Sequence, residues 1–283
     1  MKTNTILYIV SDVRSGSTVL ENILSKSKDI ISLGELHLLD SHIHKGKWGA
    51  TWNWNCSCGK SFTTCEFWLS VYKELGIKSA QEITKTQLSE GYYNRKDDIS
   101  QHNEAIQILN KIYQAVFKLS NCKVIIDSSK SPFQGVELYK NRENIFKFIH
   151  LKRDVRAVTI SKNKWSIKFF NKPLNLYKVL INTFRYRAQS NSALKNVKEE
   201  DIFTIGYEEF FENPQHHLNK IADFVGFQRI EMPEYMVLQN DHTIAGTPNR
   251  FEKRKIKLDE NWKESARKNP IFNALGYILN KLA

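Results

Sequence analysis

Short apolar runs alternate with longer segments of helical periodicity along this chain of 283 residues. The apolar runs cover residues 6–10, 30–33, 123–127, 146–151 and 201–205. They are rich in Ile, Val and Phe and apolar on both faces, as buried parallel strands are. Helical spacing begins near Ser17 and recurs over residues 99–119, 154–163, 174–195, 208–225 and from about 260. This order predicts an α/β fold with a parallel central sheet flanked by helices.

The alternation is lost between residues 36 and 100, where the chain is rich in Trp, Gly and Cys. We interpret this segment as an insertion beside the sheet that forms a cap or one wall of an acceptor site. Its aromatic residues are candidates for an apolar or cation-binding wall, namely Trp48, Trp52, Trp54, Phe62, Phe67 and Trp68. No composition shift marks a linker, so we expect a single domain over residues 1–283.

The charge balance is strongly basic, with 42 Lys and Arg against 30 Asp and Glu and a formal net charge of +12. Such a surface suits anionic ligands, including nucleotides, phosphates and sulfates. No helix-turn-helix, zinc-finger array or RNP pattern is present, so we expect no nucleic-acid partner. The lack of a long apolar run or a signal-peptide pattern predicts a cytoplasmic protein without a membrane span. The sequence indicates no oligomeric state.

The chain has four cysteines, Cys56, Cys58, Cys65 and Cys122. The first three gather in CSCGKSFTTC, and with His42 and His44 upstream they form one candidate zinc set. Their spacing matches no common structural zinc pattern. We therefore interpret the segment as a locally packed or redox-sensitive loop.

The stretch SDVRSGSTVL follows the first apolar run and leads into helical spacing. A turn and a helix N-terminus direct backbone N–H groups and a positive dipole end at an anion. Gly16 allows close approach of the backbone. Ser15, Ser17 and Thr18 add hydroxyl donors, and Arg14 adds a forked guanidinium. The stretch lacks the lysine of the GxxxxGK[ST] loop. It predicts an anion site, and the alternative is an ordinary turn with a helix cap.

A second stretch, FIHLKRDVRAVTISKNK, places Arg153 at the end of a strand and Ser161 on the following helix. Both side chains can reach one anion at the carboxyl edge of the sheet, where α/β folds bind ligands. The alternative is a helix with a solvated cationic face, for which Asp154 is the N-cap.

These stretches resemble the sulfotransferases that use 3′-phosphoadenosine-5′-phosphosulfate (PAPS). RSGST after the first strand and KRDVRAVTIS after a later one carry the resemblance. VIIDSSKSP, IGYEEFFENP, HTIAGTPNRF and the CSCG segment add to it and are typical of bacterial members. The resemblance covers residues 6 to about 262. It implies a P-loop-like fold and transfer of the sulfuryl group of PAPS, which leaves adenosine 3′,5′-bisphosphate (PAP).

The same resemblance implies a set of nucleotide-binding residues: Arg14, Ser15, Gly16, Ser17, Thr18, Arg153, Ser161, Tyr207, Gly246, Thr247 and Arg250. The first five would hold the 5′-phosphosulfate, and Arg153 and Ser161 the 3′-phosphate. Thr247 stands where family members usually have Asn, and Val155 where they often have Pro.

Sulfuryl transfer needs a base for the acceptor's proton and cations at the leaving oxygen. Glu35, in SLGELHLL, lies after the second strand, where the resemblance places the base of carboxylate-bearing members. His37 is the rival, and a helix-capping role for Glu35 is the alternative. Arg14 and Lys130 are the candidate cations. No carboxylate motif for Mg²⁺ is evident, so we expect no metal requirement.

We therefore expect a bacterial sulfotransferase that acts on a hydroxyl or amine of a small molecule. The family includes natural-product tailoring enzymes, and a saxitoxin-type alkaloid is one acceptor that the resemblance suggests. Two alternatives stay open. One is a P-loop-like small-molecule kinase, against which the missing P-loop lysine argues. The other is a non-catalytic protein that binds anions or nucleic acid through its positive charge.

Overall fold

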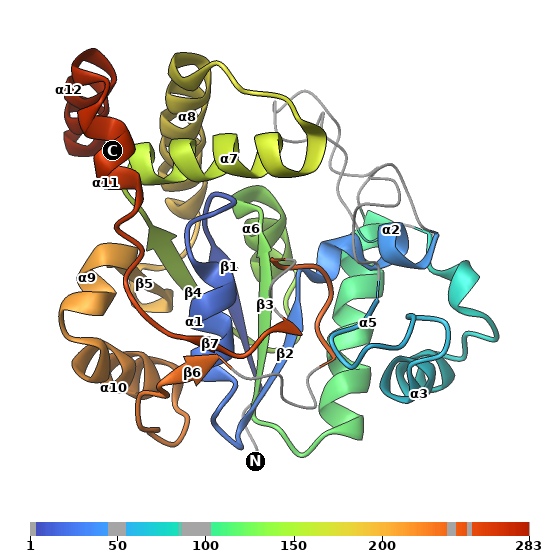
Figure 1. Cartoon of the computed structure of the whole chain (residues 1–283). Helices are drawn as coiled ribbons and strands as arrows, with labels where there is room; N and C mark the ends of the chain where they lie inside the picture. Colours follow the sequence, from blue (N-terminus) through green and yellow to red (C-terminus); the bar gives the residue numbers. More distant parts are fainter. Residues whose placement is uncertain are drawn as a thin grey trace.

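The computed structural model describes residues 4–44, 55–84, 86, 103–236, 242–247 and 251–282. Its centre is a five-stranded sheet in the order β2-β3-β1-β4-β5 (Figure 1). The strands are β1 (Thr5–Val10), β2 (Ile30–Gly34), β3 (Val124–Lys130), β4 (Ile145–Lys152) and β5 (Ile202–Gly206). All neighbouring strands are parallel, so the predicted strands and the α/β fold class are confirmed.

Each face of the sheet is buried by its own helices. One face is covered by α3 (Glu66–Glu74), α5 (Asn103–Leu119) and α6 (Pro132–Lys140), and the other by α1 (Ser17–Leu24), α9 (Tyr207–Glu212) and α10 (Pro214–Val225). Because side chains alternate along a strand, Ile6 and Tyr8 pack in the first core. Leu7 and Ile9 pack in the second. Both sides of β1 are therefore apolar, as the sequence pattern predicts for a central strand.

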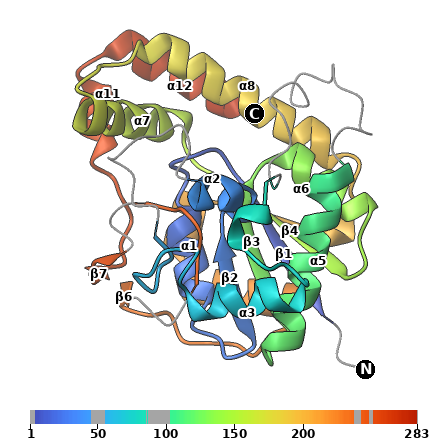
Figure 2. The same cartoon turned by 90° about the vertical axis from the view of Figure 1, so that its right-hand side faces the viewer.

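A third group of helices lies beyond the carboxyl ends of the strands, as both views show (Figures 1 and 2). It consists of α7 (Val155–Phe170), α8 (Leu176–Leu194), α11 (Trp262–Arg267) and α12 (Pro270–Lys281). Val155, Leu180 and Phe272 bury their side chains in a separate apolar cluster between these helices. The group thus stands over the edge of the sheet at which α/β proteins bind ligands.

Several helical segments differ from the hydrophobic pattern, and α7 extends to Phe170, beyond its predicted end at residue 163. The segments predicted as one helix over 208–225 and one helix from about 260 are each two helices. New helices begin at Pro214 and Pro270, where Asn213 and Asn269 cap the free N–H groups. The pattern does not predict α6, although its start carries a clear signal, a Ser131 cap followed by proline.

The segment 36–100 is described in part. It contains η1 (Leu36–Leu38), α2 (Leu39–Ile43), α3 and η2 (Ala80–Glu82). Phe62 and Trp68 are fully buried in the core that also holds Tyr8. Trp48, Trp52 and Trp54 lie outside the described residues. The cap and its aromatic wall therefore stay a prediction.

Two short strands, β6 (Tyr235–Met236) and β7 (Arg254–Lys255), form an antiparallel pair apart from the main sheet. Across the described part of the chain, no helix has both the length and the apolar character that crossing a bilayer demands.

Candidate active site

The carboxyl edge of the sheet collects the predicted site residues in the order of the strands. Glu35 directly follows β2, and Lys130 is the last residue of β3. Arg14 lies in the loop after β1, and Arg153 directly follows β4. Because β2, β3, β1 and β4 are neighbours in that order, these four residues start from adjacent points along one edge. We call them the edge row. We name its two ends after the roles that the sequence predicts: the acceptor end carries Glu35 and Lys130, and the nucleotide end carries Arg14 and Arg153.

The loop between β1 and α1 has the backbone shape of an anion-binding turn. Gly16 is the N-cap of α1 with φ of 93°, and no side chain caps this helix. The free N–H groups of the first turn therefore face outward. A Cβ at Gly16 would overlap the ring of Tyr207. Arg14 also has a positive φ, 71°, an uncommon value for a residue with a side chain. Ser15 and Ser17 are buried in the same turn.

The two arginines of the nucleotide end are in contact. Nε of Arg14 donates to Oγ of Ser161 at 3.1 Å, and Nη1 of Arg153 donates to the carbonyl of Arg14 at 3.0 Å. Arg153 is only 6% exposed. Its buried Nε–H has no hydrogen-bond acceptor among the described residues. Burial, and then the charge of Arg153, lower the pKa of Arg14. Like charges held this close favour a bound anion.

Acidic and aromatic side chains complete the surroundings of Arg153. Nη2 of Arg153 lies 3.0 Å from Oδ2 of Asp259, and its Nε lies 3.9 Å from Oε1 of Glu208. The guanidinium also lies over the ring of Tyr207, 4.5 Å from its centroid. The structure thus brings Tyr207 to the predicted nucleotide residues. Neither Asp259 nor Glu208 is predicted, since no motif connects them with the KRD segment.

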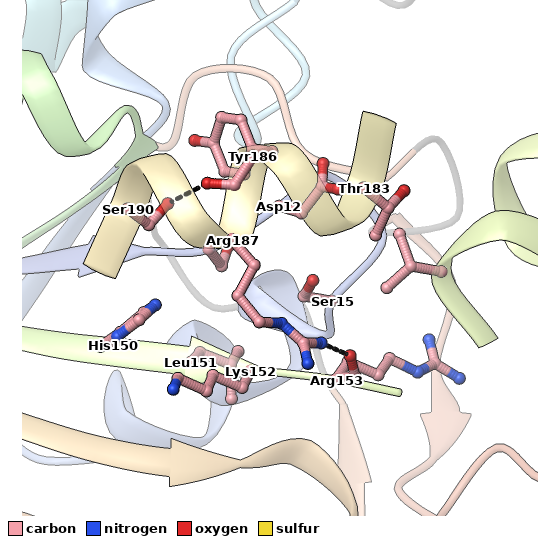
Figure 3. A pocket seen from close by; sticks show the side chains of 12 residues that line it. Asp12, Ser15, His150, Leu151, Lys152, Arg153, Thr183, Tyr186, Arg187 and Ser190 are labelled. Carbon is pink, nitrogen blue, oxygen red and sulfur yellow. Dashed lines mark hydrogen bonds between the residues drawn. The ribbon is translucent and has the colours of Figure 1, made fainter. Parts of the chain in front are cut away.

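A small pocket lies beside the loop, beneath α8 (Figure 3). It is lined by Ser11, Asp12, Ser15, His150, Leu151, Lys152, Arg153, Val158, Thr183, Tyr186, Arg187 and Ser190. Arg187 reaches from α8 to donate to the carbonyl of Arg153 (Figure 3). Burial, followed by Lys152 and Arg187, lowers the pKa of His150 to about 3, so its imidazole is neutral near pH 7. Sequence reasoning misses His150, Lys152 and Arg187, although His150 and Lys152 are two residues apart and therefore share one face of β4.

At the acceptor end, a carboxylate and an ammonium group form an ion pair. Oε1 of Glu35 lies 2.6 Å from Nζ of Lys130, with 15% and 9% of the two side chains exposed. The N–H of Gly246 donates to the same oxygen at 3.2 Å. Burial acts to raise the pKa of Glu35, but Lys130 and His37 together with these hydrogen bonds outweigh it, so the pKa lies below its ordinary value. Glu35 is thus ionised near neutral pH, as a base must be.

His37 also lies at the acceptor end, close enough to Glu35 for their charges to interact. The backbone N–H of His37 donates to Oγ of Ser129 at 3.1 Å. Burial lowers the pKa of its imidazole to about 4, although the neighbouring Glu35 acts in the opposite direction. Its buried Nδ1 has no hydrogen-bond partner within the described parts of the chain. Both Glu35 and His37 are therefore in a proton-accepting form near pH 7, and Glu35 differs in its pairing with a lysine.

Asp127 is a buried residue of β3 that contacts the acceptor end through Ser129, and sequence reasoning does not predict it. Its carboxyl group accepts hydrogen bonds from the hydroxyl of Tyr113 at 2.5 Å and from the N–H of Ser129 at 2.8 Å. Burial raises the pKa of Asp127 to about 6. Since Ser129 also contacts His37, Asp127 links β3 to the candidate bases. The sequence signal that could have identified Asp127 is its position shortly before Lys130 in VIIDSSK.

The described part of the HTIAGTPNRF loop contacts the acceptor end. The N–H of Glu35 donates to the carbonyl of Ile244 at 2.9 Å, and Gly246 donates to the Glu35 carboxylate. Thr247 directly follows this contact, whereas Arg250 lies outside the described residues. The sequence resemblance assigns this loop to the nucleotide, and that contact stays a prediction.

The three clustered cysteines meet a histidine far along the chain. The ligand atoms of Cys56, Cys58, Cys65 and His242 all lie within 4.8 Å of one another. His44 instead has its Nε2 2.9 Å from the carbonyl of Ile83, and the ring of His42 lies edge-on to Phe62. The candidate set with His42 and His44 is therefore not the set that the fold assembles.

The parallel sheet, the uncapped helix N-terminus and the edge row define an α/β protein with the backbone and the cations of an anion site at the carboxyl ends of its strands. A model of the sulfotransferase family matches residues 7–231. The chain therefore belongs to the sulfotransferase family, which confirms the resemblance that its motifs show.

Two solved structures share the fold. The sulfotransferase domain of the Synechococcus PCC 7002 olefin synthase is 19% identical, with a TM-score of 0.56 over 93% of this chain and 88% of that one. The sulfotransferase domain from the curacin biosynthetic pathway is 17% identical, with a TM-score of 0.53 over 94% and 92% of the two chains. These likenesses confirm the P-loop-like sulfotransferase fold. No curated protein matches the sequence.

Proposed function

We propose that the protein transfers the sulfuryl group of PAPS to a hydroxyl or amine of a small-molecule acceptor. The observation that carries this proposal is that the edge row has cations at two separate points, Lys130 at the end of β3 and Arg153 directly after β4. Because β1 lies between β3 and β4, the two strands are two interstrand spacings apart, or about 10 Å at roughly 4.8 Å per spacing. PAPS has a phosphosulfate on one side of its ribose and a phosphate on the other, so its charges match this separation.

The nucleotide end would hold the two anionic groups of PAPS. The N–H groups of the loop around Gly16, with Arg14, bind the 5′-phosphosulfate. Ser161 and the free Nε–H of Arg153 bind the 3′-phosphate, which takes the place of Asp259 beside the guanidinium. The bound nucleotide then neutralises the two arginines and relieves their mutual repulsion. This relief favours a nucleotide with two anionic groups over a nucleotide with one.

The acceptor end would supply the chemistry. The acceptor oxygen or nitrogen attacks sulfur in line with the bridging oxygen, and the S–O bond to the phosphate breaks. The bonding electron pair stays on the phosphate, which leaves PAP, while Glu35 takes the acceptor's proton. Lys130 stabilises the charge that develops on the leaving oxygen. Because Lys130 and Arg14 already supply positive charge at this point, we propose no metal for the transfer step.

The acceptor would enter from the side of Glu35. We propose a metabolite with a free hydroxyl or amine, and a saxitoxin-type alkaloid is one compound to include in an acceptor screen. The protein would then act in the cytoplasm, where PAPS and such metabolites are both available.

Calorimetry with three nucleotides tests the proposal. PAP should bind about 10- to 100-fold more tightly than 5′-AMP, because a lost buried, charge-assisted contact costs roughly 1.5–3 kcal/mol. Equal affinity for PAP and 5′-AMP would contradict the assignment of the second phosphate site. Tight binding of ATP with Mg²⁺, and none of PAP, would instead support the kinase alternative. Transfer of labelled sulfuryl from PAPS to a panel of alcohols and amines then identifies the acceptor class.

A further inference from the structure

A compact cluster of three thiols and one imidazole joins two segments that are far apart in the chain. Cys56, Cys58 and Cys65 come from the segment before and at the start of α3, and His242 comes from the loop after β6. We propose that these four residues bind one zinc ion, which ties the two segments together. Three thiolates and a histidine, all supplied by the protein, are the ligand set of a closed structural zinc site.

The distances between the ligand atoms support this proposal. Zn–S and Zn–N bonds of about 2.3 and 2.0 Å in a tetrahedron put two sulfurs about 3.8 Å apart and a sulfur and a nitrogen about 3.5 Å apart. Sγ of Cys65 lies 3.6 Å from Sγ of Cys58 and 3.8 Å from Sγ of Cys56. Nδ1 of His242 lies 3.2 Å from Sγ of Cys65 and 3.6 Å from Sγ of Cys56. The two remaining pairs both involve the exposed Cys58 and lie within 4.8 Å, so a small movement of Cys58 completes the tetrahedron.

The local backbone arranges the thiols. Gly59 has φ of 88°, and its N–H donates to the carbonyl of Cys56 at 2.8 Å, which closes a tight turn around Cys58. Cys65 is the N-cap of α3, where the positive end of the helix dipole favours a thiolate. A short turn that presents two cysteines, followed by a third at a helix start, holds all three sulfurs on one side of the segment.

The imidazole of His242 is oriented by groups outside the cluster. Its ring stacks on Phe67, with centroids 4.5 Å apart and planes 6° from parallel. Its carbonyl accepts a hydrogen bond from the indole of Trp68 at 3.0 Å. Supporting contacts of this kind set the direction of a metal-ligating histidine. Ser57 and Thr243 add two more hydrogen bonds between the same segments.

The thiols do not form a disulfide. A disulfide needs sulfurs about 2.05 Å apart, whereas Sγ of Cys65 lies 3.6 Å from that of Cys58 and 3.8 Å from that of Cys56. All four cysteines of the chain are free thiols. A shared ion explains better than a disulfide why three sulfurs and a ring nitrogen converge on one point.

The site would also position a residue of the proposed mechanism. Two residues after His242, the carbonyl of Ile244 accepts from the N–H of Glu35, and Gly246 then donates to the Glu35 carboxylate. Zinc would therefore act on the proposed base through the backbone of this loop. This consequence rests on the proposed function, whereas zinc binding itself does not.

Metal analysis of the full-length chain, purified without chelators, tests the proposal. We expect about one zinc per chain, at least a tenfold lower content in Cys65→Ser and His242→Ala, and a lower melting temperature after chelation. Cys122→Ser and His216→Ala are matched controls that should keep their zinc, since Cys122 lies outside the cluster and His216 is exposed on α10. Because the cluster variants can fail to fold, the chelated wild-type chain is also reconstituted with Co²⁺. Thiolate-to-cobalt charge transfer and intense tetrahedral d–d bands are expected.

Three outcomes would overturn the site. The first is less than about a tenth of an equivalent of zinc together with no thiolate–cobalt absorption. The second is a metal signal that follows Cys122 rather than Cys65. The third is an intramolecular disulfide among Cys56, Cys58 and Cys65, detected by intact mass before and after reduction. PAP affinity is measured on the same samples, so failure of the zinc site and failure of the nucleotide assignment are seen separately.

Discussion

The two ends of the edge row hold their charges in opposite ways. At the nucleotide end, the buried guanidinium of Arg153 donates to the backbone carbonyl of the half-buried Arg14, and one buried N–H of Arg153 has no acceptor among the described residues. At the acceptor end, Glu35 and Lys130 neutralise each other across 2.6 Å. In the proposed function, a bound anion neutralises the cations of the nucleotide end. The net charge of the acceptor end changes only when Glu35 takes a proton.

This contrast predicts how the two ends respond to substitution. Removing a cation from the nucleotide end should weaken binding of the nucleotide. Removing either partner of the acceptor-end pair should slow turnover while the nucleotide still binds. Four experiments test this separation and a fifth tests the stability of the acceptor end, from the largest expected effect to the smallest.

The largest effect is expected for Glu35→Gln. Glutamine keeps the size and polarity of the side chain but cannot take the acceptor's proton, and general bases contribute about 10²–10⁴-fold to rates. Steady-state kinetics should show a fall in kcat of that order, and calorimetry should show unchanged PAP affinity. His37→Ala is the control and should cost far less. If Glu35→Gln keeps more than about a tenth of kcat while His37→Ala abolishes turnover, the histidine is the base.

Lys130→Ala should lower kcat by about 10²–10³, as loss of one preorganised electrostatic donor does. PAP affinity should change less, because the product no longer carries the sulfuryl group that Lys130 faces. A large rise in the KM for PAPS with kcat intact would show that Lys130 is a binding residue instead.

The same variant makes a pH prediction. Burial acts to raise the pKa of Glu35, and Lys130 is the largest opposing influence. Without the lysine, the pKa of Glu35 rises, so the base becomes protonated at a higher pH. The acidic limb of the kcat/KM profile should therefore move to higher pH in Lys130→Ala than in the wild-type chain. An unmoved limb would mean that the profile reports another group.

At the nucleotide end, Arg153→Ala should weaken PAP binding about 10- to 100-fold and leave 5′-AMP almost unchanged. Arg229→Ala is the matched control, because Arg229 forms an exposed pair with Asp223. Calorimetry with both nucleotides measures the difference. An equal loss for PAP and 5′-AMP would place Arg153 away from the 3′-phosphate.

The smallest effect concerns stability rather than activity. Asp127 has its pKa raised to about 6 by burial, against about 3.9 in an unfolded chain. Its protonated form therefore stabilises the fold below about pH 4, and this contribution is lost as pH rises through 6. Urea unfolding across pH 4–8 should show that Asp127→Asn removes a slope of at most about 1.4 kcal/mol per pH unit. Equal slopes in both chains would show that Asp127 ionises freely.

Much of the fold follows from local pattern. The five apolar runs are the five strands, because a buried parallel strand must be apolar on both faces. Helix boundaries at Asn213 and Asn269 are less predictable, since apolar periodicity continues across them while the following proline interrupts the backbone hydrogen bonds. The start of α6 at Ser131 is a local signal that the hydrophobic pattern does not include.

The sequence by itself determined the family, the turn around Gly16 at the start of α1 and the strand-end places of Arg14, Glu35, Lys130 and Arg153. These depend on short stretches, since a turn that follows a strand lies at the sheet edge whichever strands become neighbours. Only the tertiary structure decided which side chains meet. It paired Glu35 with Lys130, set Asp259 beside Arg153, and brought His242 rather than His42 to the cysteines. The physical reason is that strand order and long-range packing, not spacing along the chain, determine the distance between groups whose charges interact.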